Sequence, residues 1–442
     1  MKVAYHTLGC KLNFSETSQL AQLLKKEGFE EVEFDHFADL YIINTCSVTA
    51  NADKECKSIV NRALHQNPEA LIAITGCYAQ LKPESISKIP GVSLVLGANE
   101  KFNIAAYKQL IAGSNESMIK SCEIAEVVNF IPSHSGSHRT RVFVKVQDGC
   151  DYNCSFCTIP LARGKSRSNT LENIIDQCNQ LADEGTNEIV LTGINLGDVG
   201  RLHPDEKHSF TCHQMMEALE LRCSVNRIRI SSIEPNLLKD ETIELIASSH
   251  KIMPHFHIPL QSGSDELLKR MRRRYQRHTY ESRIALIKQL MPHACIGSDI
   301  ICGFPGETEE EFETTYRFLD QLPISYLHVF TYSERDNTLA VTFNSRVPMK
   351  ERKKRTNILR TLSLKKQMAF EQSQSNGVHE VLFEAGNQKD SISGYTQNYI
   401  KAKIPYSINL INSICKVKLH YSKEDFSYHA TPISQDVGVL PV

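Results

Sequence analysis

Short apolar runs alternate with amphipathic stretches through the N-terminal quarter of the chain. The apolar runs, each expected to be a strand, lie at 2–8, 38–46, 70–77 and 94–100. Between them, residues 15–29 and 52–67 have helical periodicity, with Ser15 as the predicted N-cap and Gly28 as the stop of the first helix. Strand followed by helix, repeated in this order, predicts a parallel sheet with flanking helices.

The same alternation continues through the middle of the chain. Strand candidates lie at 139–149, 187–195, 227–235, 254–263, 295–305 and 325–333. The stretch from 112 to 140, which contains serine and glycine clusters, is typical of a linker that flanks one or two short strands. After residue 372 the pattern changes to short strands with turn residues between them, which predicts a small β-barrel. The predicted fold class is therefore α/β with a C-terminal all-β module.

Composition and charge narrow the function classes. The chain has 442 residues, of which 41% are hydrophobic and 23% charged, as in an ordinary globular protein of several domains. The net charge of −1 excludes a uniformly basic nucleic-acid coat. Lys2 is followed at once by a strand-like run instead of a leader, and no apolar stretch approaches the ~18 residues of a membrane span. We therefore expect a cytoplasmic protein with no membrane contact.

Cations concentrate in two segments, 269–277 and 350–366. Clustered Arg and Lys are the footprint of phosphate contacts, whereas a solvated or packed helix face is the ordinary interpretation of a charge run. For 350–366 both interpretations stay open, because Ile358, Leu359 and Leu362 also fit an amphipathic helix packed on a barrel. For Arg272, Arg273 and Arg274 we favour contacts with substrate or internal salt bridges.

Fourteen cysteines in a chain without a leader indicate metal binding or catalysis, because cytosolic thiols stay reduced. Eight of them lie in apolar or helical contexts and are interpreted as small buried or incidental residues: Cys56, Cys122, Cys178, Cys212, Cys223, Cys295, Cys302 and Cys415. The remaining six form two sets of three.

The first set lies at the ends of three predicted strands. Cys10, Cys46 and Cys77 end the runs "LGC", "NTC" and "TGC". In parallel sheets the functional crevice lies outside the carboxyl ends of the strands, so three strands would deliver three thiols to one edge. Each cysteine also has a small or polar neighbour that lets the backbone approach a ligand, which makes an accidental placement the weaker interpretation.

The second set lies in one loop, "DGCDYNCSFC", where Cys150, Cys154 and Cys157 have the spacing C-x₃-C-x₂-C. Thiolates are soft ligands that suit iron–sulfur clusters. Three cysteines leave one iron of a 4Fe-4S cluster without a protein ligand, and that iron can bind something else. A zinc site is the alternative, but no histidine is suitably spaced beside these cysteines.

With Phe156 before its last cysteine, this loop resembles the signature of the radical S-adenosylmethionine (SAM) superfamily. Together with the first set of cysteines, the chain resembles the methylthiotransferase family along nearly its whole length. The agreeing segments are "TLGCKLNFSET", "NTCSVT", "GCYAQ", "ARGKSRS", "IPLQSGSD", "MRRRY" and "GFPGETEEEF". "TLGCKLN" and "CTIPLARGKSRS" favour the branch that acts on threonylcarbamoyladenosine at position 37 of tRNA. The branches acting on isopentenyladenosine or on a ribosomal protein are the alternatives.

The resemblance implies four regions: an N-terminal methylthiotransferase domain (1–115), a linker (116–138), a radical SAM core (139–370) and a TRAM-like RNA-binding domain (372–442). The core would be a partial, open (β/α) barrel with SAM across the carboxyl ends of its strands. The cluster ligands would be the six cysteines of the two sets. The residues implied near SAM or substrate are Thr192, Gly193, Glu234, Gln261, Ser262, Asp299 and Gly303. Glu234 before Pro235 can equally end a strand.

The resemblance also implies a mechanism and partners. SAM bound to the cluster of the loop cysteines would yield a radical that abstracts hydrogen from carbon 2 of the modified adenine. The cluster on Cys10, Cys46 and Cys77 would supply the sulfur, methylated by a second SAM. A flavodoxin or ferredoxin would donate electrons, and the tRNA anticodon loop would bind as an accessible single strand to a monomeric enzyme. Tyr395, Tyr399, Lys401 and Lys403 would offer RNA-binding surface or be ordinary strand positions. An iron–sulfur RNA-binding redox sensor is the non-enzyme alternative.

Overall fold

The computed structural model describes residues 1–47, 50–113, 118–136, 140–375, 377–386 and 390–433. The N-terminal region is a parallel sheet in the order β2-β1-β3-β4-β5-β6. Its strands are β1 (Lys2–Thr7), β2 (Glu30–Val32), β3 (Leu40–Thr45), β4 (Leu71–Gly76), β5 (Leu94–Leu96) and β6 (Met118–Lys120). Its helices are α1 (Lys11–Lys26), α2 (Ala50–Gln66), α3 (Cys77–Leu81), α4 (Pro83–Ser87) and α5 (Ile104–Ile111), with a short 3₁₀ turn η1 (Glu100–Phe102). Apolar clusters cover both faces of this sheet, as the fully buried β3 requires.

The four predicted N-terminal strands are all present, and β6 lies within 112–140, where one or two short strands were expected, but the short strand β2 was not predicted. None of the three residues of β2 is buried, so this strand carries little apolar signal. The prediction of Ser15 as an N-cap was wrong, because α1 begins four residues earlier, at Lys11. Ser15 lies inside the helix, where its hydroxyl donates to the Leu12 carbonyl at 2.9 Å. The predicted boundaries at 115/116 and 138/139 lie outside the described residues.

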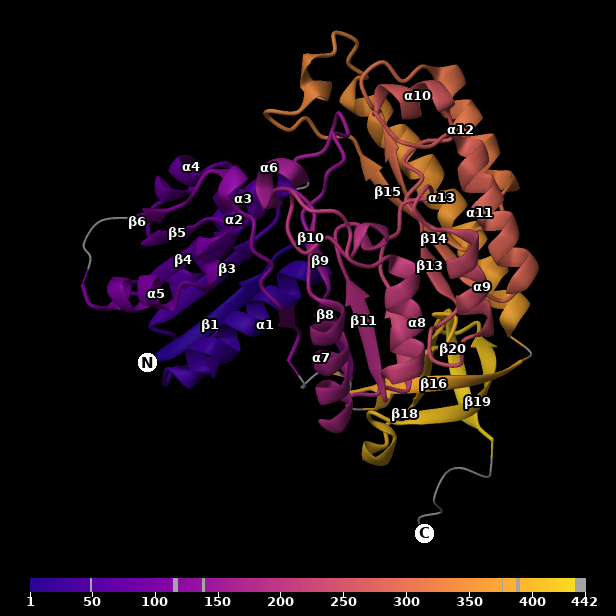
Figure 1. Ribbon diagram of the computed structural model, residues 1–442, viewed down its shortest axis with the longest axis horizontal. Helices are drawn as coiled ribbons and strands as arrows, with labels where there is room; N and C mark the ends of the chain where they lie inside the picture. Colours follow the sequence, from indigo (N-terminus) through magenta and orange to yellow (C-terminus); the bar gives the residue numbers. More distant parts are fainter. Residues whose placement is uncertain (48–49, 114–117, 137–139, 376, 387–389, 434–442) are drawn as a thin grey trace.

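The central region is a partial barrel of parallel strands (Figure 1). Its strands are β8 (Arg141–Lys145), β11 (Glu188–Thr192), β12 (Arg227–Ile230), β13 (His255–His257), β14 (Cys295–Cys302) and β15 (Tyr326–Thr331), with β7 (Ser133–His134) antiparallel at the open edge. Two sheets, β12-β11-β8-β7 and β13-β14-β15, are joined by single bridges such as Ser232 to His257. The six predicted strands of this region are therefore confirmed.

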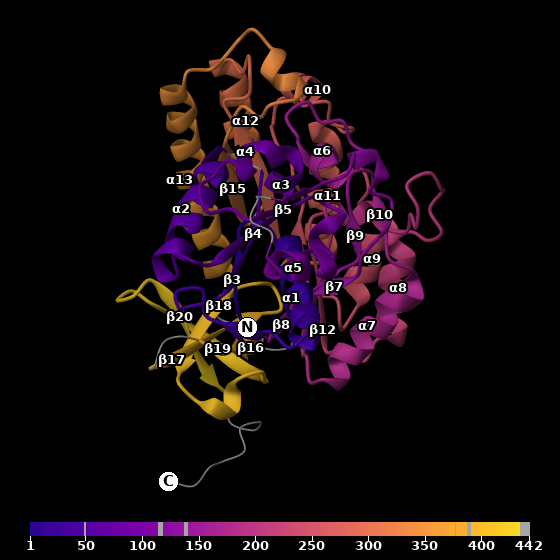
Figure 2. The same ribbon diagram turned by 90° about the vertical axis from the view of Figure 1, so that its left-hand side faces the viewer.

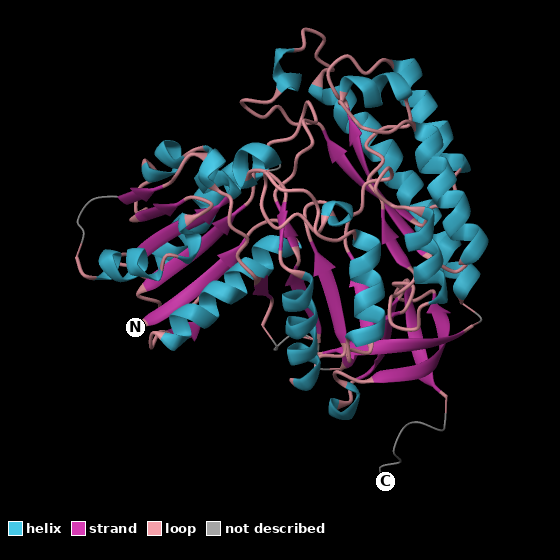
Figure 3. Ribbon diagram, in the orientation of Figure 1, coloured by secondary structure: helices cyan, strands magenta, loops and turns pink. Residues whose placement is uncertain are grey.

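Helices cover the outside of these strands (Figure 3). They are α7 (Leu171–Asp183), α8 (Cys212–Arg222), α9 (Asp240–Ser248), α10 (Asp265–Arg270), α11 (Arg277–Leu290), α12 (Glu309–Gln321) and α13 (Met349–Gln374). The short helix α6 (Ile159–Arg163) lies instead beside α3 of the N-terminal region (Figure 1). Alternate strand residues such as Val142, Leu191 and Ile228 join the main apolar core under these helices. The residues between them therefore face the inner side of the barrel, which we call the lumen. Connecting segments include η2 (Ile124–Glu126), the β9–β10 ribbon (Gln147–Asp148 and Arg167–Ser168), η3 (Leu196–Asp198) and η4 (Leu339–Thr342).

The C-terminal region is a closed barrel in the order β16-β17-β18-β20-β19. It comprises β16 (Val378–Glu384), β17 (Ser391–Thr396), β18 (Lys401–Pro405), β19 (Ile414–Ser422) and β20 (Ser427–Pro432), with η5 (Ile408–Leu410). Figure 2 shows it at one end of the molecule, and it contacts the amino ends of the partial-barrel strands through several buried arginines. The predicted small β-barrel is thus confirmed.

Two tyrosines of this barrel do not lie where an RNA-binding surface was considered. The Tyr395 ring lies 4.2 Å from the guanidinium of Arg141, and the Tyr399 ring stacks on His255 with ring centroids 4.2 Å apart. Arg229 lies 5.0 Å from the Tyr399 ring. Both tyrosines therefore close the lower end of the lumen, and their role is to join the two barrels.

The basic segment 350–366 lies in α13, where the interpretation as a packed helix is correct for one face. Leu359 and Leu362 are buried in the main core. Arg352 and Arg355 are buried as well, and they form ion pairs with Glu334 and Glu307 at 2.6 and 2.8 Å. These two arginines are structural cations, because buried charges need partners that offset their desolvation.

Candidate functional site

The first trio of cysteines lies at the carboxyl edge of the N-terminal sheet. β1, β3 and β4 are adjacent, and Thr45 of β3 pairs with Gly76 of β4. Cys46 and Cys77 are the next residues on these two strands, so they leave the sheet side by side. Cys10 follows β1 on the other side of β3 and caps the start of α1. Because neighbouring strands are about 4.8 Å apart, this register brings three thiols to one place.

At this sheet edge, the backbone before Cys10 lies so close to Cys46 that only glycine fits at position 9. Gly9 has φ +102°, and a Cβ there would lie 2.7 Å from Cβ of Cys46. The side chain of Asn13, one turn into α1, donates to the carbonyls of Leu8 and Thr45 at 2.7 and 3.1 Å. Asn13 thus joins the loops that carry Cys10 and Cys46.

The second trio lies in the loop 149–158, which follows β9 at the carboxyl end of the partial barrel. The loop is closed by hydrogen bonds from the Cys150 amide to the Gly164 carbonyl at 3.0 Å and from the Ser155 amide to the Met271 carbonyl at 3.1 Å. Gly149 has φ +72°, and a Cβ there would lie 2.0 Å from the Lys165 carbonyl oxygen. The loop conformation therefore requires glycine at this position.

Each sulfur of this loop accepts a hydrogen bond. The amides of Tyr152 and Ile159 lie 3.4 Å from Sγ of Cys150 and of Cys157, and Arg273 donates to Sγ of Cys154 at 2.9 Å. Burial nevertheless raises the pKa of Cys150 and of Cys157 to about 12. Thiolates in this loop therefore need a positive partner, and iron supplies one, with hydrogen bonds to sulfur as a usual accompaniment.

The spacing of the sulfur atoms separates the two metals considered for the trios. Among the residues that the structure describes, neither trio has all three sulfur atoms within 4.8 Å of one another. A single zinc ion, with Zn–S bonds of about 2.3 Å, needs sulfur atoms only about 4 Å apart. In this structure, neither trio therefore has its sulfur atoms at the spacing of a single zinc ion.

A buried charge network joins the two trios. Arg163, which lies six residues after Cys157, donates to Oε1 of Glu16 at 3.0 Å and to Oδ1 of Asp148 at 2.9 Å. It also donates to Oδ1 of Asn13 at 2.6 Å. Lys101, Lys145 and Arg167 complete the network through further ion pairs with the same two carboxylates. Four cations therefore face two carboxylates, which leaves a net charge of +2 beside the first trio.

Arg163 also has an unused donor. Its Nε is buried and, within the described part of the chain, has no hydrogen-bond partner. Burial raises the pKa of the Cys77 thiol, and the charge of Arg163 opposes this effect more than any other group does. The surplus of positive charge and the orphaned buried N–H of this network fit a neighbouring anionic cluster.

Glu234 and Arg273 lie beside the second trio. They form an ion pair, and Arg273 is the arginine that donates to Sγ of Cys154. Burial raises the pKa of Glu234, against the opposing charge of Arg273. Asn236, two residues further on, donates to the Tyr152 hydroxyl at 2.9 Å. The segment after β12 is thus held against the cysteine loop, and Glu234 is positioned as a hydrogen-bond acceptor at the edge where SAM was predicted.

The remaining predicted SAM or substrate contacts separate into two groups. Thr192 and Gly193 end β11 at the same edge as the cysteine loop, and a Cβ on Gly193 would lie 2.9 Å from Oε1 of Gln147. Ser262 instead hydrogen-bonds to Thr315 of α12 at 3.3 Å.

Gly303 and Gln261 are each fixed by a close contact with a neighbouring segment of the barrel. A Cβ on Gly303 would strike the side chain of Arg352 at 2.2 Å. The Gln261 amide donates to the Asp299 carbonyl at 2.8 Å, with Gln261 at φ +69°. The direct roles of Thr192, Gly193, Ser262, Gly303 and Gln261 toward SAM or substrate stay predictions.

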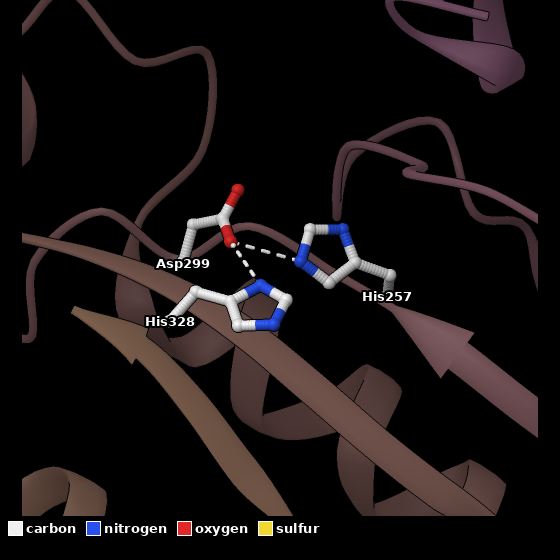
Figure 4. Close-up of side chains that lie close together, drawn as sticks. All are labelled: His257, Asp299 and His328. Atoms are coloured by element: carbon white, nitrogen blue, oxygen red, sulfur yellow. Dashed lines mark hydrogen bonds and ion pairs between the residues drawn. The ribbon is translucent and has the colours of Figure 1, made fainter. Parts of the chain in front are cut away.

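Asp299 lies in the lumen between two histidines (Figure 4). Nε2 of His257 and Nδ1 of His328 both lie near Oδ1 of Asp299, at 2.9 and 3.2 Å. The other ring nitrogen of His257 lies 2.6 Å from the Ser232 hydroxyl. Burial opposes ionisation of Asp299, but the two imidazoles outweigh it and lower the pKa of this carboxyl. The cluster therefore presents oriented imidazoles to whatever enters the lumen.

A lysine from the start of α1 also enters the lumen. Nζ of Lys11 lies 6.0 Å from the centroid of the Phe143 ring, on the inner side of β8. Burial and the charges of Arg141 and Arg229 lower the pKa of Lys11 to about 8. Lys11 directly follows Cys10, so one residue step separates the first trio from the lumen.

Sequence reasoning did not identify Lys11, Arg163, Gln147, His257 or His328 as site residues. Lys11 and Arg163 lie within the quoted segments "TLGCKLN" and "ARGKSRS", so their position beside cysteines was the available signal. Gln147 is a single buried amide that donates to the Gly149 carbonyl at 2.8 Å and accepts from the Ile194 amide at 2.8 Å. Nothing in its sequence context indicates that role.

The chain matches two families over separate segments. Residues 2–97 match the family described as "Uncharacterized protein family UPF0004", and residues 144–319 match the "Radical SAM superfamily". The first segment contains Cys10, Cys46 and Cys77, and the second contains the cysteine loop.

Several curated proteins are similar to the chain over most of its length. "Threonylcarbamoyladenosine tRNA methylthiotransferase MtaB" of Bacillus subtilis is 40% identical over 426 residues, which cover 94% of this chain and 93% of that protein. The protein of the same name from Aquifex aeolicus is 37% identical, with 91% and 96% covered. "tRNA-2-methylthio-N(6)-dimethylallyladenosine synthase" of Clostridium botulinum is 34% identical, with 87% and 86% covered.

Among solved structures, the chain is similar in fold to the radical S-adenosylmethionine methyltransferase TsrM from Kitasatospora setae. The TM-score is 0.55 at 15% sequence identity, with 74% of this chain and 72% of that chain covered. Within the described residues, no helix of this chain is both long and apolar enough to cross a membrane.

Proposed function

Since the chain belongs to the family of radical SAM tRNA methylthiotransferases, we propose that it adds a methylthio group to carbon 2 of threonylcarbamoyladenosine at position 37 of tRNA. The observation that carries this proposal is the pair of cysteine trios at adjoining sheet edges, joined by the buried network around Arg163. The names of the relatives from Bacillus subtilis and Aquifex aeolicus support the choice of nucleoside.

Enzymes of this family use SAM and two 4Fe-4S clusters. We assign Cys150, Cys154 and Cys157 to one cluster and the trio at the N-terminal sheet edge to the other. When bound, these groups supply the electron that cleaves SAM reductively and the sulfur that is transferred. Three ligands per cluster leave one iron open in each, which suits two different tasks.

The chain's own residues orient the reactants. The amides of Tyr152 and Ile159 and the guanidinium of Arg273 donate to the loop sulfur atoms and lower the basicity of these thiolates. Glu234, held by Arg273, is the proposed acceptor for the ribose hydroxyls of SAM. Thr192 and Gly193 at the end of β11 are proposed to face the amino group of SAM. Asp299, Gln261, Ser262 and Gly303 complete the predicted set.

We propose that the three regions predicted from the sequence have separate functions. Residues 1–115 carry the auxiliary cluster, 139–370 the radical chemistry, and 372–442 a TRAM-like barrel that contacts tRNA. Exposed Lys401 supports the last assignment, whereas Lys403 is engaged with Asp425 at 3.1 Å. The anticodon loop of tRNA would be the bound element, a flavodoxin or ferredoxin the electron donor, and a cytoplasmic monomer the working form.

A second candidate substrate is isopentenyladenosine in tRNA. The relative from Clostridium botulinum, whose name specifies the dimethylallyl nucleoside, is 34% identical over 394 residues. The chemistry would be the same, and only the group on N6 of the adenine would differ. The two candidates are therefore distinguished by the product and not by the cofactors.

The test is nucleoside mass spectrometry of tRNA after anaerobic incubation with reconstituted protein, SAM, sulfide and a reductant. We expect a methylthio mass gain on threonylcarbamoyladenosine that is lost in Cys10→Ala and in Cys154→Ala. Cys122→Ala, outside both trios, is the matched control and keeps the gain. A gain on isopentenyladenosine alone would move the chain to the second candidate. No gain on any nucleoside would contradict both.

A further inference from the structure

The lower lumen holds more positive than negative charge. Its cations are Lys11, Arg141, Arg227 and Arg229, and the carboxylates that face them are Glu188, Glu380 and Glu384. Four cations against three carboxylates leave a charge of +1. His255 does not compensate for it, because a histidine carries no negative charge in either protonation state.

The arginines of this cluster form ion pairs with carboxylates, whereas Lys11 forms none with a described residue. Arg141 is paired with Glu384 at 2.7 Å, and Arg229 with Glu188 at 2.9 Å, each through two hydrogen bonds. No hydrogen bond or ion pair joins Nζ of Lys11 to any described residue, and its nearest aromatic contact is the Phe143 ring at 6.0 Å. A partly buried cation with like charges around it gains most from a bound anion.

The inner face of β15 is open to solvent. On β15, His328 and Phe330 face inward, since Leu327 and Val329 between them are in the outer core. His328 is nevertheless 54% exposed and Phe330 40% exposed, although both lie in mid-strand. The inner side of the barrel is thus open beside the His257–Asp299–His328 cluster, and Lys11 is itself only partly buried.

We infer that Lys11 binds the carboxylate of the threonylcarbamoyl group, and thereby selects this nucleoside over one with an apolar group on N6. The inference rests on the proposed function, which it extends to a specificity residue. Carbon 2 and N6 lie on the same edge of the adenine ring. Lys11 follows Cys10 directly, so a base whose carbon 2 faces the first trio would turn its N6 substituent toward this lysine.

The test compares two RNA substrates on the same enzyme. One is an anticodon stem-loop carrying threonylcarbamoyladenosine, and the other carries the same group with its carboxylate converted to the neutral primary amide. For the wild-type protein we expect kcat/KM to fall about 10- to 100-fold on the amide, the range for a hydrogen bond between charged groups. In Lys11→Met, kcat/KM on the carboxylate substrate should fall by the same factor, and the amide should be unaffected.

Lys25→Met, at the exposed far end of the same helix, is the matched control and should keep the wild-type preference. Iron content and SAM cleavage by Lys11→Met, measured in parallel, show whether the neighbouring cluster is intact. Equal wild-type rates on both substrates would overturn the inference while leaving the proposed function in place. An equal loss on both substrates in Lys11→Met would overturn it too. Absence of methylthio product from the wild type would instead overturn the proposed function.

Discussion

The loop trio and the sheet-edge trio reach similar chemistry by different routes. Cys150, Cys154 and Cys157 lie within eight consecutive residues, and their arrangement follows from one loop with its own internal hydrogen bonds. The sheet-edge trio is spread from residue 10 to residue 77 and is assembled by the register of three parallel strands. One trio is a local structure, and the other exists only when the sheet is formed.

The charges around the trios differ as well. Beside the loop trio, Arg273 shares its charge with Glu234, and Arg274 donates to the Asp151 carbonyl of the same loop. The sheet-edge trio faces a network with a net charge of +2, whose central member, Arg163, comes from the loop trio's own segment. The difference teaches that the sheet-edge trio depends on the partial barrel for its electrostatic environment, whereas the loop trio depends much less on the N-terminal sheet.

Glycine substitutions test the geometric side of this comparison and should have the largest effect. In Gly149→Ala the new Cβ would meet a backbone carbonyl that cannot move aside, so we expect loss of the loop cluster and of all SAM cleavage. In Gly9→Ala the Cβ would displace the side chain of Cys46, so only the sheet-edge cluster should be lost. Iron content and 5′-deoxyadenosine formation measure both effects.

Gly28→Ala is the control for this pair. Gly28 has φ +86°, but no neighbouring atom lies within 4 Å of the position that a Cβ would take. The backbone strain should therefore cost about 1–2 kcal/mol and leave the iron content unchanged. If Gly9→Ala kept both clusters, the close packing of the sheet-edge trio would be of no consequence for ligation.

Arg163→Met tests whether the sheet-edge trio depends on the positive charge around it. Removing the guanidinium leaves Glu16 and Asp148 buried with fewer partners, which should lower the free energy of unfolding by about 3–5 kcal/mol. We also expect the sheet-edge cluster to be lost or to shift its reduction potential downward, because a positive neighbour is removed. Urea unfolding and spectroscopic redox titration measure the two effects.

Arg317→Met, in the exposed ion pair with Glu313, should change the free energy of unfolding by less than about 1 kcal/mol. The account would be wrong if Arg163→Met altered the loop cluster and left the sheet-edge cluster as it was. The conservative Arg163→Lys should recover part of the stability but not the two parallel hydrogen bonds that Arg163 donates to the Glu16 carboxylate.

The contact between the two barrels provides a smaller, pH-dependent effect. Burial and neighbouring positive charge lower the pKa of His255 in the folded protein, so this imidazole stays neutral on the stack with Tyr399. Below pH ~6.5 the imidazole of His255 is protonated in the unfolded chain but stays neutral in the folded chain. The free energy of unfolding therefore decreases as the pH is lowered, by at most ~1.4 kcal/mol per pH unit. The groups whose charges act on His255 are Arg229, Lys11, His257 and Arg141.

His255→Phe keeps an aromatic stack and removes the titrating group, so urea unfolding of this variant between pH 7.5 and 5.5 should be less steep in pH than that of the wild type. His278→Phe, at an exposed position, should retain the wild-type slope. An unchanged slope in His255→Phe would show that other groups carry the acid sensitivity.

The sequence was sufficient to predict the strands, the fold class and the convergence of both trios, because each depends on local pattern and on the rule that parallel strands end at one edge. Lys11 and Arg163 could not be predicted in the same way. Their neighbours Phe143 and Asn13 belong to the other region, and only the docking of the N-terminal region on the partial barrel brings them together. His328 faces Asp299 on the adjacent strand of the same sheet, a register that the sequence pattern does not reveal. Tyr395 and Tyr399 show the same limit, since their pattern fits a solvent-facing strand equally well.

The central claim is that the two trios hold separate clusters with separate tasks. It is tested most directly with Cys77→Ser, by measuring 5′-deoxyadenosine and methylthio nucleoside in the same anaerobic reaction on threonylcarbamoyladenosine tRNA. The account predicts that iron falls to about half, SAM cleavage continues and no methylthio nucleoside forms. Methylthio product from this variant, or loss of SAM cleavage with the loop cluster intact, would contradict it.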